Sequence, residues 1–460
     1  MDCRMNVLFI YTNINGLHDD SYAFGLASIV SVARDSGYNA KVIIVRGKSE
    51  YPKVLEEIIA FKPRVIGFTS VSSQFSFVKD IAGLVKEKIP DCITVCGGVH
   101  PTINPGCILE AKCLDAIFVG ESEDSFVEFL NKAERGQDYK DVDNLAYVLD
   151  AEVKINKLKP LIANLDRLPY PDKEIYPYAD TLKETGHAPF LFSRGCPFLC
   201  SYCSNHMIAK RYGLLRNNPR YRSVQSCIAE IEETVKKFDL KTIWILDDIF
   251  GIDKKWRLEF CAEYKKRIKI KFICILRVDV IDDEFMRMLK DSGCFRIFIG
   301  IESGNDFVRR TIMNRNMTND QIIRAFRIAH KYGLQTNAIN MMGLPGETED
   351  MVWDTIKLNR IIKPTVSCVN IFYPYKGTKL GDQCFQQGLV NESVYSDFSN
   401  ERRESVLNFS PEYKKKLVYY LENWEMLVYP FNFKKRLIKF LRKTFLWSYL
   451  RAFARRFITT

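Results

Sequence analysis

The sequence lacks long apolar segments: no run of about 18 uncharged apolar residues occurs in the chain, so we expect no membrane-spanning helix. We also expect no secretion signal, because the first apolar run, Val7–Tyr11, is too short for a signal-peptide core and no small-residue cleavage site follows it. Both absences predict a cytoplasmic protein. The 14 cysteines are then expected to be reduced thiols or metal ligands rather than disulfides.

Acidic residues are absent from residues 431–460, which carry nine bases. The net charge of the chain is +11, so the first 430 residues carry only +2 and show no extended nucleic-acid footprint. We therefore expect no nucleic-acid partner. The tail has the spacing of two short amphipathic helices. This pattern suits either a peripheral contact with the inner face of an anionic membrane or packing on the protein with a solvated basic face.

Strand-like and helix-like patterns alternate along residues 1–137. Such alternation implies crossover units and a parallel sheet. We predict an α/β fold whose first domain is a doubly wound, Rossmann-like parallel sheet. The expected strands are Val7–Tyr11, Lys41–Val45, Arg64–Thr69, Ile93–Cys96 and Ala116–Val119, and the expected helices cover 22–36, 52–61, 75–88 and 122–133.

A second alternating series fills residues 186–400, after a linker at 138–185 that is rich in Pro, Asp and Tyr near its centre and contains two strand-like pieces. Six strand–helix units predict a partial (β/α)6 TIM-like barrel, although an open sheet has the same pattern. Residues 401–460 read as a helical C-terminal tail. The expected strands are Phe190–Ser193, Thr242–Leu246, Lys271–Leu276, Arg296–Ile301, Thr336–Met342 and Ser367–Phe372, with helices at 223–238, 254–267, 282–292, 319–332 and 349–361.

Three cysteines, Cys196, Cys200 and Cys203, are spaced C-x3-C-x2-C just after the first strand of the second domain. Three thiolates on one tight loop suit an iron–sulfur cluster, and a 4Fe–4S cluster held by three thiolates keeps one iron open to a further ligand. Two alternatives stay open: a zinc site with His206 as the fourth ligand, and three buried structural thiols.

This motif resembles that of the radical S-adenosylmethionine (SAM) enzymes. The resemblance covers roughly residues 185–400 and implies that the open iron binds SAM, whose reductive cleavage gives a 5′-deoxyadenosyl radical. Taken singly, the other matching residues have ordinary explanations as turns, helix caps or surface bases, but all of them fall at predicted strand ends. The resemblance assigns SAM contacts to Tyr202, Asp247, Asp248, Glu302, Ser303, Arg315 and Gly343. The Asp-Asp pair replaces the family's usual Gly-Gly-Glu.

The first domain resembles the cobalamin-binding domain of the cobalamin-dependent members of that family. Glycines at its strand ends would let the backbone approach a large cofactor. The resemblance assigns cobalamin contacts to Ser70, Ser72, Gly97, Gly98, His100, Gly120 and Glu121. The loop 13–20 lacks the Asp-x-His-x-x-Gly pattern, so a histidine is not the expected lower cobalt ligand, and His100 is expected to have a structural or phosphate-tail role. An empty or repurposed domain is the alternative.

The resemblance implies an enzyme with three cofactors, a 4Fe–4S cluster, SAM and cobalamin, and an electron donor such as flavodoxin or ferredoxin. The expected reaction is methylation of an unactivated carbon, or of a phosphinate phosphorus, in a small-molecule or lipid-like substrate. Two alternatives stay open. One is a radical enzyme that forms rings, rearranges or oxidises its substrate. The other is a non-enzymatic iron–sulfur or zinc module used for binding or sensing.

Overall fold

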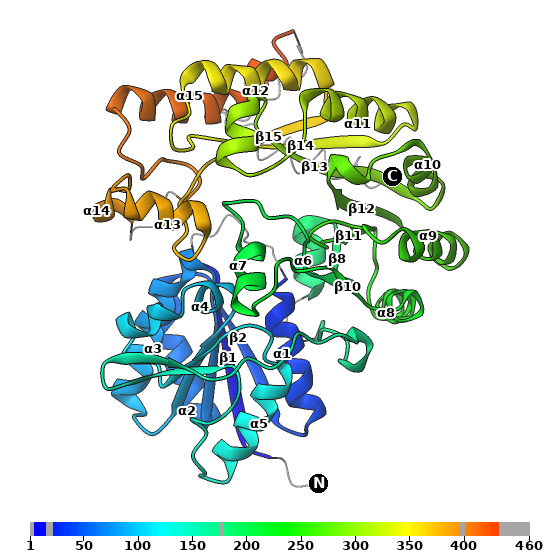
Figure 1. The fold of residues 1–460 in the computed structure, drawn as a ribbon. Helices are drawn as coiled ribbons and strands as arrows, with labels where there is room; N and C mark the ends of the chain where they lie inside the picture. The colour runs from blue at the N-terminus through cyan, green and yellow to red at the C-terminus, as the bar shows by residue number, and fades with distance from the viewer. Residues whose placement is uncertain (1–3, 15–21, 175–177, 396–400, 432–460) are drawn as a thin grey trace.

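The computed structural model describes residues 4–14, 22–174, 178–395 and 401–431, and it shows two α/β domains, one above the other (Figure 1). The first domain, coloured blue to cyan, lies below the second, coloured green to orange. Helix α7 (Ser204–Arg211) of the second domain extends down toward helix α4 (Val99–Ile103) of the first. The two domains therefore face one another across a shared boundary.

A seven-stranded sheet of order β2-β1-β3-β4-β5-β6-β7 forms the first domain. Its first five strands are parallel, as predicted from the alternating pattern, and the last two add an antiparallel hairpin. The strands are β1 (Asn6–Thr12), β2 (Asn39–Val45), β3 (Val65–Thr69), β4 (Ile93–Gly97), β5 (Ala116–Phe118), β6 (Leu145–Leu149) and β7 (Glu152–Ile155).

Helices cover both faces of this sheet, which explains why its central strands, such as β1 and β3, are largely apolar. In β1, Val7 and Phe9 pack into one core, while Leu8 and Ile10 pack into another. The first core includes residues of α1 (Phe24–Asp35) and α5 (Glu123–Glu134), and the second includes residues of α2 (Tyr51–Phe61) and α3 (Phe75–Lys88). This arrangement confirms the prediction of a doubly wound sheet.

The hairpin of β6 and β7 differs in placement from the sequence-based expectation. Both strands were expected as strand-like pieces within the linker 138–185, but β6 pairs with β5 through Ile117 and Phe118 and so extends the first sheet. The pattern of a short hairpin does not show which sheet edge it joins, because that depends on where the chain folds back. The connection between domains therefore follows Ile155.

The second domain contains a six-stranded parallel sheet of order β15-β14-β13-β12-β11-β8, so β8 and β15 are its free edges. This is the predicted six-unit, partial-barrel arrangement. The strands are β8 (Ala188–Phe190), β11 (Thr242–Ile245), β12 (Lys271–Leu276), β13 (Cys294–Glu302), β14 (Gln335–Met342) and β15 (Val366–Ile371). The intervening helices are α8 (Val224–Lys237), α9 (Lys254–Arg267), α10 (Asp283–Asp291), α11 (Asn319–Lys331) and α12 (Glu349–Ile362).

Several short elements were not predicted. Besides α4 and α7 they include α6 (Tyr178–Thr185) and the two-residue strands β9 (Ser193–Arg194) and β10 (Arg220–Tyr221), which pair with each other. Elements this short contain too few residues to show a period of 2 or 3.6. Their positions matter, because β9 and α7 bracket the three cysteines.

The chain after β15 is helical, with α13 (Lys379–Gln386), α14 (Glu392–Tyr395) and α15 (Pro411–Val428). Of these, α15 lies in the predicted helical tail 401–460, whereas α13 and α14 were not predicted. None of the helices in the described ranges is long and apolar enough to cross a membrane. Most of the basic segment 431–460, with its predicted membrane contact, and most of the loop 13–20 lie outside the described residues.

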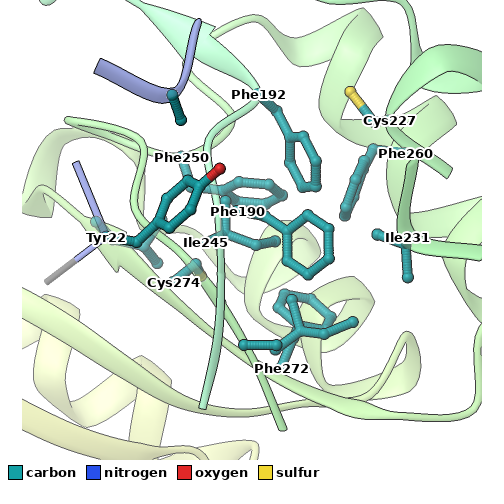
Figure 2. Close-up of a cluster of buried hydrophobic side chains, with 14 of the residues drawn as sticks. Tyr22, Phe190, Phe192, Cys227, Ile231, Ile245, Phe250, Phe260, Phe272 and Cys274 are labelled. Carbon is teal, nitrogen blue, oxygen red and sulfur yellow. The ribbon is translucent and has the colours of Figure 1, made fainter. Parts of the chain in front are cut away.

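One apolar core continues from the first domain into the second. Figure 2 shows Tyr22, which precedes α1, in the same cluster as Phe190 of β8, and aromatic rings such as Phe192 and Phe260 continue the cluster toward α8 and α9. Tyr22 also packs on Tyr178 of α6, with 5.8 Å between ring centroids. A shared core of this kind holds the two domains in one relative position.

Candidate active site

The three cysteines lie on the loop Cys196–Cys203, between β9 and α7. Main-chain hydrogen bonds fix this loop to two other segments. The Ser201 amide donates to the Met313 carbonyl at 3.0 Å, and its hydroxyl donates to the Ile312 carbonyl at 2.6 Å. The Leu380 amide of α13 donates to the Ser201 carbonyl at 2.8 Å. The loop is therefore held in place by protein contacts that involve no metal.

Cys200 is the most buried of the three cysteines and receives two cationic donors. Arg277 Nη1 lies 3.7 Å and Arg315 Nη1 lies 3.6 Å from Cys200 Sγ. Both contacts place positive charge beside this sulfur atom. Burial raises the pKa of Cys196 to about 11 and that of Cys203 to about 12, so these thiols are protonated at neutral pH until a metal displaces the protons.

Among the described residues, no three His, Cys, Asp or Glu side chains converge as the ligands of one metal ion do. A cube of four irons separates its thiolate ligands more widely than a single ion does. His206, the possible fourth zinc ligand, lies on α7 with both ring nitrogens buried and without a hydrogen-bond partner in the described structure. The donor set of three thiols beside two arginines fits an anionic iron–sulfur cluster.

Three of the predicted SAM contacts meet beside Cys200. Arg315 Nη1 lies 3.3 Å from the Tyr202 hydroxyl and 4.0 Å from a Glu302 carboxylate oxygen, and Nη2 donates to the Gly300 carbonyl. Burial raises the pKa of Glu302 above its usual value, although Arg315 opposes this shift. Arg315 Nε is buried, and no described residue accepts a hydrogen bond from it. A buried N–H of a charged group that lacks a hydrogen-bond partner fits an anionic ligand such as a carboxylate.

The two adjacent predicted SAM contacts, Asp247 and Asp248, lie in different environments. Asp247 is fully buried and accepts hydrogen bonds from the Phe192 amide at 2.7 Å, the Ser193 amide at 3.2 Å and the Ser193 hydroxyl at 2.7 Å. Asp248 keeps exposed surface, although surrounding protein atoms raise the pKa of its carboxyl and a hydrogen bond with Asn205 opposes the shift. Asp247 thus anchors the start of the cysteine loop, while Asp248 is available to a ligand.

Replacing Asp247 with asparagine tests this anchoring role. Burial raises the pKa of Asp247 from 3.8 to about 7, so the folded protein holds a proton that the unfolded chain has lost. The stability contributed by this site is therefore greatest below 3.8 and falls as the pH rises to about 7. Asp247→Asn keeps an acceptor for both amides and cannot titrate, so its unfolding free energy should lack this pH dependence.

Urea unfolding at several pH values measures the difference between the wild-type protein and Asp247→Asn. Asp247→Ala is the matched comparison, because it leaves buried donors unsatisfied at a cost of about 1–3 kcal/mol each. A wild-type pH profile retained in Asp247→Asn would contradict the assignment.

Ser303 and Gly343, the remaining predicted SAM contacts, are engaged in local structure. Ser303 is fully buried, with its hydroxyl 3.4 Å from that of Thr355 and accepting from the Asn305 amide at 3.2 Å. Gly343 has a φ of +75° and donates its amide to Glu347 at 2.5 Å, in the turn after β14. Their contact with SAM stays a prediction.

A cavity of about 320 Å³ lies at the carboxyl edge of the first sheet, between the two domains. Its walls are mostly apolar and combine phenylalanines of the first domain with Leu168, Pro169 and Pro171 of the connecting segment. Of the predicted cobalamin contacts, Gly97, Gly98, Gly120 and Glu121 line it. A cavity of this size holds a small organic group, such as one end of a large cofactor.

The other predicted cobalamin contacts, Ser70, Ser72 and His100, lie outside the lining of this cavity. They form a cluster at the same sheet edge, where the Ser72 hydroxyl is 3.0 Å from His100 Nδ1 and the His100 amide donates to the Ser70 carbonyl. Burial lowers the pKa of His100 to about 4, with help from Lys376 and Lys79, so the imidazole is neutral. Their contact with cobalamin also stays a prediction.

Sequence reasoning missed the polar residues that border the cavity at the domain boundary. Arg194 and Arg222 come from the second domain, and Ser28 and Glu123 from the first. Glu123 follows the recognised Gly120-Glu121 pair by two residues, but an acid in the first turn of a helix is usually explained by the helix dipole. Contacts across a domain boundary leave no periodic signal in one sequence.

Two domain families match the chain. Residues 190–358 match the radical SAM superfamily, and residues 13–130 match the B12 binding domain. The chain is a cobalamin-binding radical SAM enzyme. The family has three cofactors, a 4Fe–4S cluster, SAM and cobalamin, and the radical SAM match favours the predicted enzyme over a binding or sensing module.

Curated relatives of this radical SAM enzyme have different reactions in their names. An uncharacterized methyltransferase of Pyrococcus horikoshii is 29% identical over 80% of this chain and 79% of the relative. The anaerobic magnesium-protoporphyrin IX monomethyl ester cyclase of Rubrivivax gelatinosus is 26% identical over 98% and 82%. The cytidylyl-2-hydroxyethylphosphonate methyltransferase of Streptomyces wedmorensis is 23% identical over 82% and 80%.

Solved structures share the fold of the enzyme. The cobalamin-dependent radical SAM enzyme OxsB with aqua-cobalamin bound aligns with a TM-score of 0.74 at 16% identity, over 98% of this chain and 71% of that one. The radical SAM methyltransferase TsrM from Kitasatospora setae aligns with a TM-score of 0.68 at 17% identity, over 83% and 76%. At these identities the likeness concerns the fold alone.

Proposed function

We propose that this enzyme methylates an unactivated carbon, or a phosphinate phosphorus, of a small-molecule or lipid-like substrate. The observation that carries the proposal is that Arg194, two residues before Cys196, lines the cavity of the B12 binding domain. The cysteine loop and the cavity therefore adjoin, so a methyl donor and a radical source would meet over one substrate. Two relatives named as methyltransferases support the choice of reaction.

When bound, the cluster and SAM supply a 5′-deoxyadenosyl radical, and cobalamin supplies a methyl group. The residues of this chain would bind and orient these groups. Cys196, Cys200 and Cys203 would hold the cluster. Arg315 would pair with the SAM carboxylate through its unpartnered Nε, and Asp248 would accept from the SAM amine.

The other proposed cofactor contacts are residues that lie beside Arg315 or line the cavity. Tyr202 and Glu302 border Arg315 and would contact the nucleoside part of SAM. Gly97, Gly98, Gly120 and Glu121 line the cavity and would contact one end of cobalamin. An external electron donor, such as flavodoxin or ferredoxin, would reduce the cluster.

Anaerobic incubation with methyl-labelled SAM tests the proposal. The reduced protein, loaded with cluster and cobalamin, should form 5′-deoxyadenosine and transfer the label to a cosubstrate. Candidate cosubstrates should include phosphonate nucleotides and polycyclic isoprenoids, since the relatives named as methyltransferases include a hopanoid C-3 methylase. Formation of 5′-deoxyadenosine with a substrate that gains no label would overturn methylation but keep the radical chemistry.

Ring formation is the second candidate. The observation that favours it is the cyclase of Rubrivivax gelatinosus, which aligns with 98% of this chain. The two reactions differ in product mass, because methylation adds a carbon and ring closure by oxidation removes hydrogen. Mass spectrometry of the product therefore distinguishes them.

A further inference from the structure

An ion-pair network joins the cysteine loop to the cavity wall. Arg194 Nη2 donates to Glu123 Oε1 at 2.7 Å, and its Nη1 lies 3.6 Å from Glu121 Oε1. Ser28 of α1 donates its hydroxyl to the same Glu123 oxygen at 3.0 Å. We call Arg194, Glu121, Glu123 and Ser28 the Arg194 network. All four residues border the cavity.

Glu123 has one oxygen in use and one without a partner. Its side chain is 4% exposed, and Oε2 is buried with no hydrogen-bond partner anywhere in the described ranges. An unpaired carboxylate oxygen in so buried a place is costly unless a donor reaches it. Because Glu123 borders the cavity, rotation of its carboxylate would bring Oε2 within reach of a hydroxyl or amide N–H of a bound molecule.

Glu121 is the other carboxylate of the network, and both of its oxygens already accept hydrogen bonds. Arg220 donates to both of its oxygens, at 2.7 and 2.8 Å, and the Ile162 amide donates at 2.9 Å. Burial alone would raise the pKa of Glu121, but Arg220 and Arg194 together hold it below its usual value. Glu121 therefore stays ionised and fixed, which leaves Glu123 as the carboxylate that can respond to a ligand.

Arg194 is the member of the network that adjoins the cysteine loop. It is followed directly by Gly195, whose φ of +103° turns the chain toward Cys196. A Cβ at Gly195 would lie 2.7 Å from Asn217 Oδ1, so this position of the turn requires glycine. Arg194 therefore adjoins the turn that leads to the first of the three cysteines.

We propose that Arg194 is a positioning residue that couples occupancy of the cavity to the cysteine loop through Glu123. A ligand with a hydroxyl or amide donor on a largely apolar body, as at the nucleotide end of cobalamin, bonds Glu123 Oε2. Glu123 Oε1 then holds Arg194 in one orientation, and the loop is ordered for the cluster. Coupling of this kind is reciprocal, so the loaded cluster must also tighten binding in the cavity. The inference rests on the two cofactors of the proposed function and not on which group is transferred.

The test measures the dissociation constant of hydroxocobalamin by its absorbance change, with and without the reconstituted cluster. In the wild-type chain we expect cluster loading to tighten binding by about five- to tenfold, at the lower end of typical couplings. The ratio of the dissociation constants without and with the cluster should fall to about one in Arg194→Gln and Glu123→Gln. Arg194→Lys keeps the charge and should retain part of the wild-type ratio. Release of iron to a ferrous chelator is the second readout, and hydroxocobalamin should slow it in the wild-type chain but not in Arg194→Gln or Glu123→Gln.

Arg34→Gln is the matched control. Arg34 Nη1 pairs with Asp172 of the connecting segment at 2.5 Å, outside the lining of the cavity, so this variant also loses an arginine–carboxylate pair and should keep the wild-type ratio. A ratio of about one in the wild-type chain, or a full ratio in Arg194→Gln, would overturn the inference. If coupling is present but no labelled product forms, only the proposed methylation fails; if product forms without coupling, only the Arg194 inference fails.

Discussion

Cys200→Ala is expected to lose formation of 5′-deoxyadenosine by more than about 100-fold, because even the outer-sphere partners of metal ligands cost 10- to 100-fold when changed. Cys200 is the buried cysteine of the loop, and the only one of the three whose thiol receives guanidinium contacts in the described structure, from Arg277 and Arg315. With two thiolates left, the cluster has lost one ligand, and this is the ligand that lies beside Arg277 and Arg315. Iron content per chain should fall with the activity.

The fold should survive this change. Arg277 still pairs with Asp279, and Arg315 still donates to the Gly300 carbonyl, so neither arginine loses all its partners. Cys113→Ala is the control, because Cys113 is a half-buried cysteine of the first domain. Iron content and circular dichroism measure the two effects separately. Wild-type iron and 5′-deoxyadenosine in Cys200→Ala would exclude the loop as the cluster site.

The arrangement of strands and helices could be predicted because burial on both faces leaves a simple pattern. Strands covered by helices on both sides are largely apolar, as β1 and β3 are. In the helices between them, apolar residues recur about every 3.6 residues. The hairpin of β6 and β7 shows the limit of such reasoning. Its local pattern is plain, but its choice of partner strand depends on tertiary packing.

A candidate site can be proposed from sequence where one short segment carries the chemistry. The three cysteines are such a case, and the structure places them on one loop, as their spacing indicates. The sequence does not show how the adjacent residues Asp247 and Asp248 differ: the first bonds the backbone of Phe192 and Ser193, and only the second keeps exposed surface. Arg194 gave no signal, because its partners are contributed by a different domain.

Arg315→Gln is expected to weaken SAM binding strongly while the cluster stays in place. The guanidinium lies within 4.0 Å of Glu302 and 3.3 Å of the Tyr202 hydroxyl, and its buried Nε has no partner among the residues described. Removing one member of a buried, hydrogen-bonded charge pair costs about 2–5 kcal/mol, which is roughly 30- to 5,000-fold in affinity. Glutamine keeps polar atoms near Cys200 but cannot form a paired fork with a carboxylate.

Equilibrium dialysis of labelled SAM against the anaerobic, cluster-loaded protein measures this loss. Arg310→Gln is the matched control, because Arg310 lies nearby in the chain but pairs with Asp306 at the surface, where exposed ion pairs contribute little. We expect wild-type iron in both variants and wild-type SAM affinity only in Arg310→Gln. If Arg315→Gln binds SAM as the wild type does, the SAM carboxylate has another partner, and the unpaired Nε must serve the substrate instead.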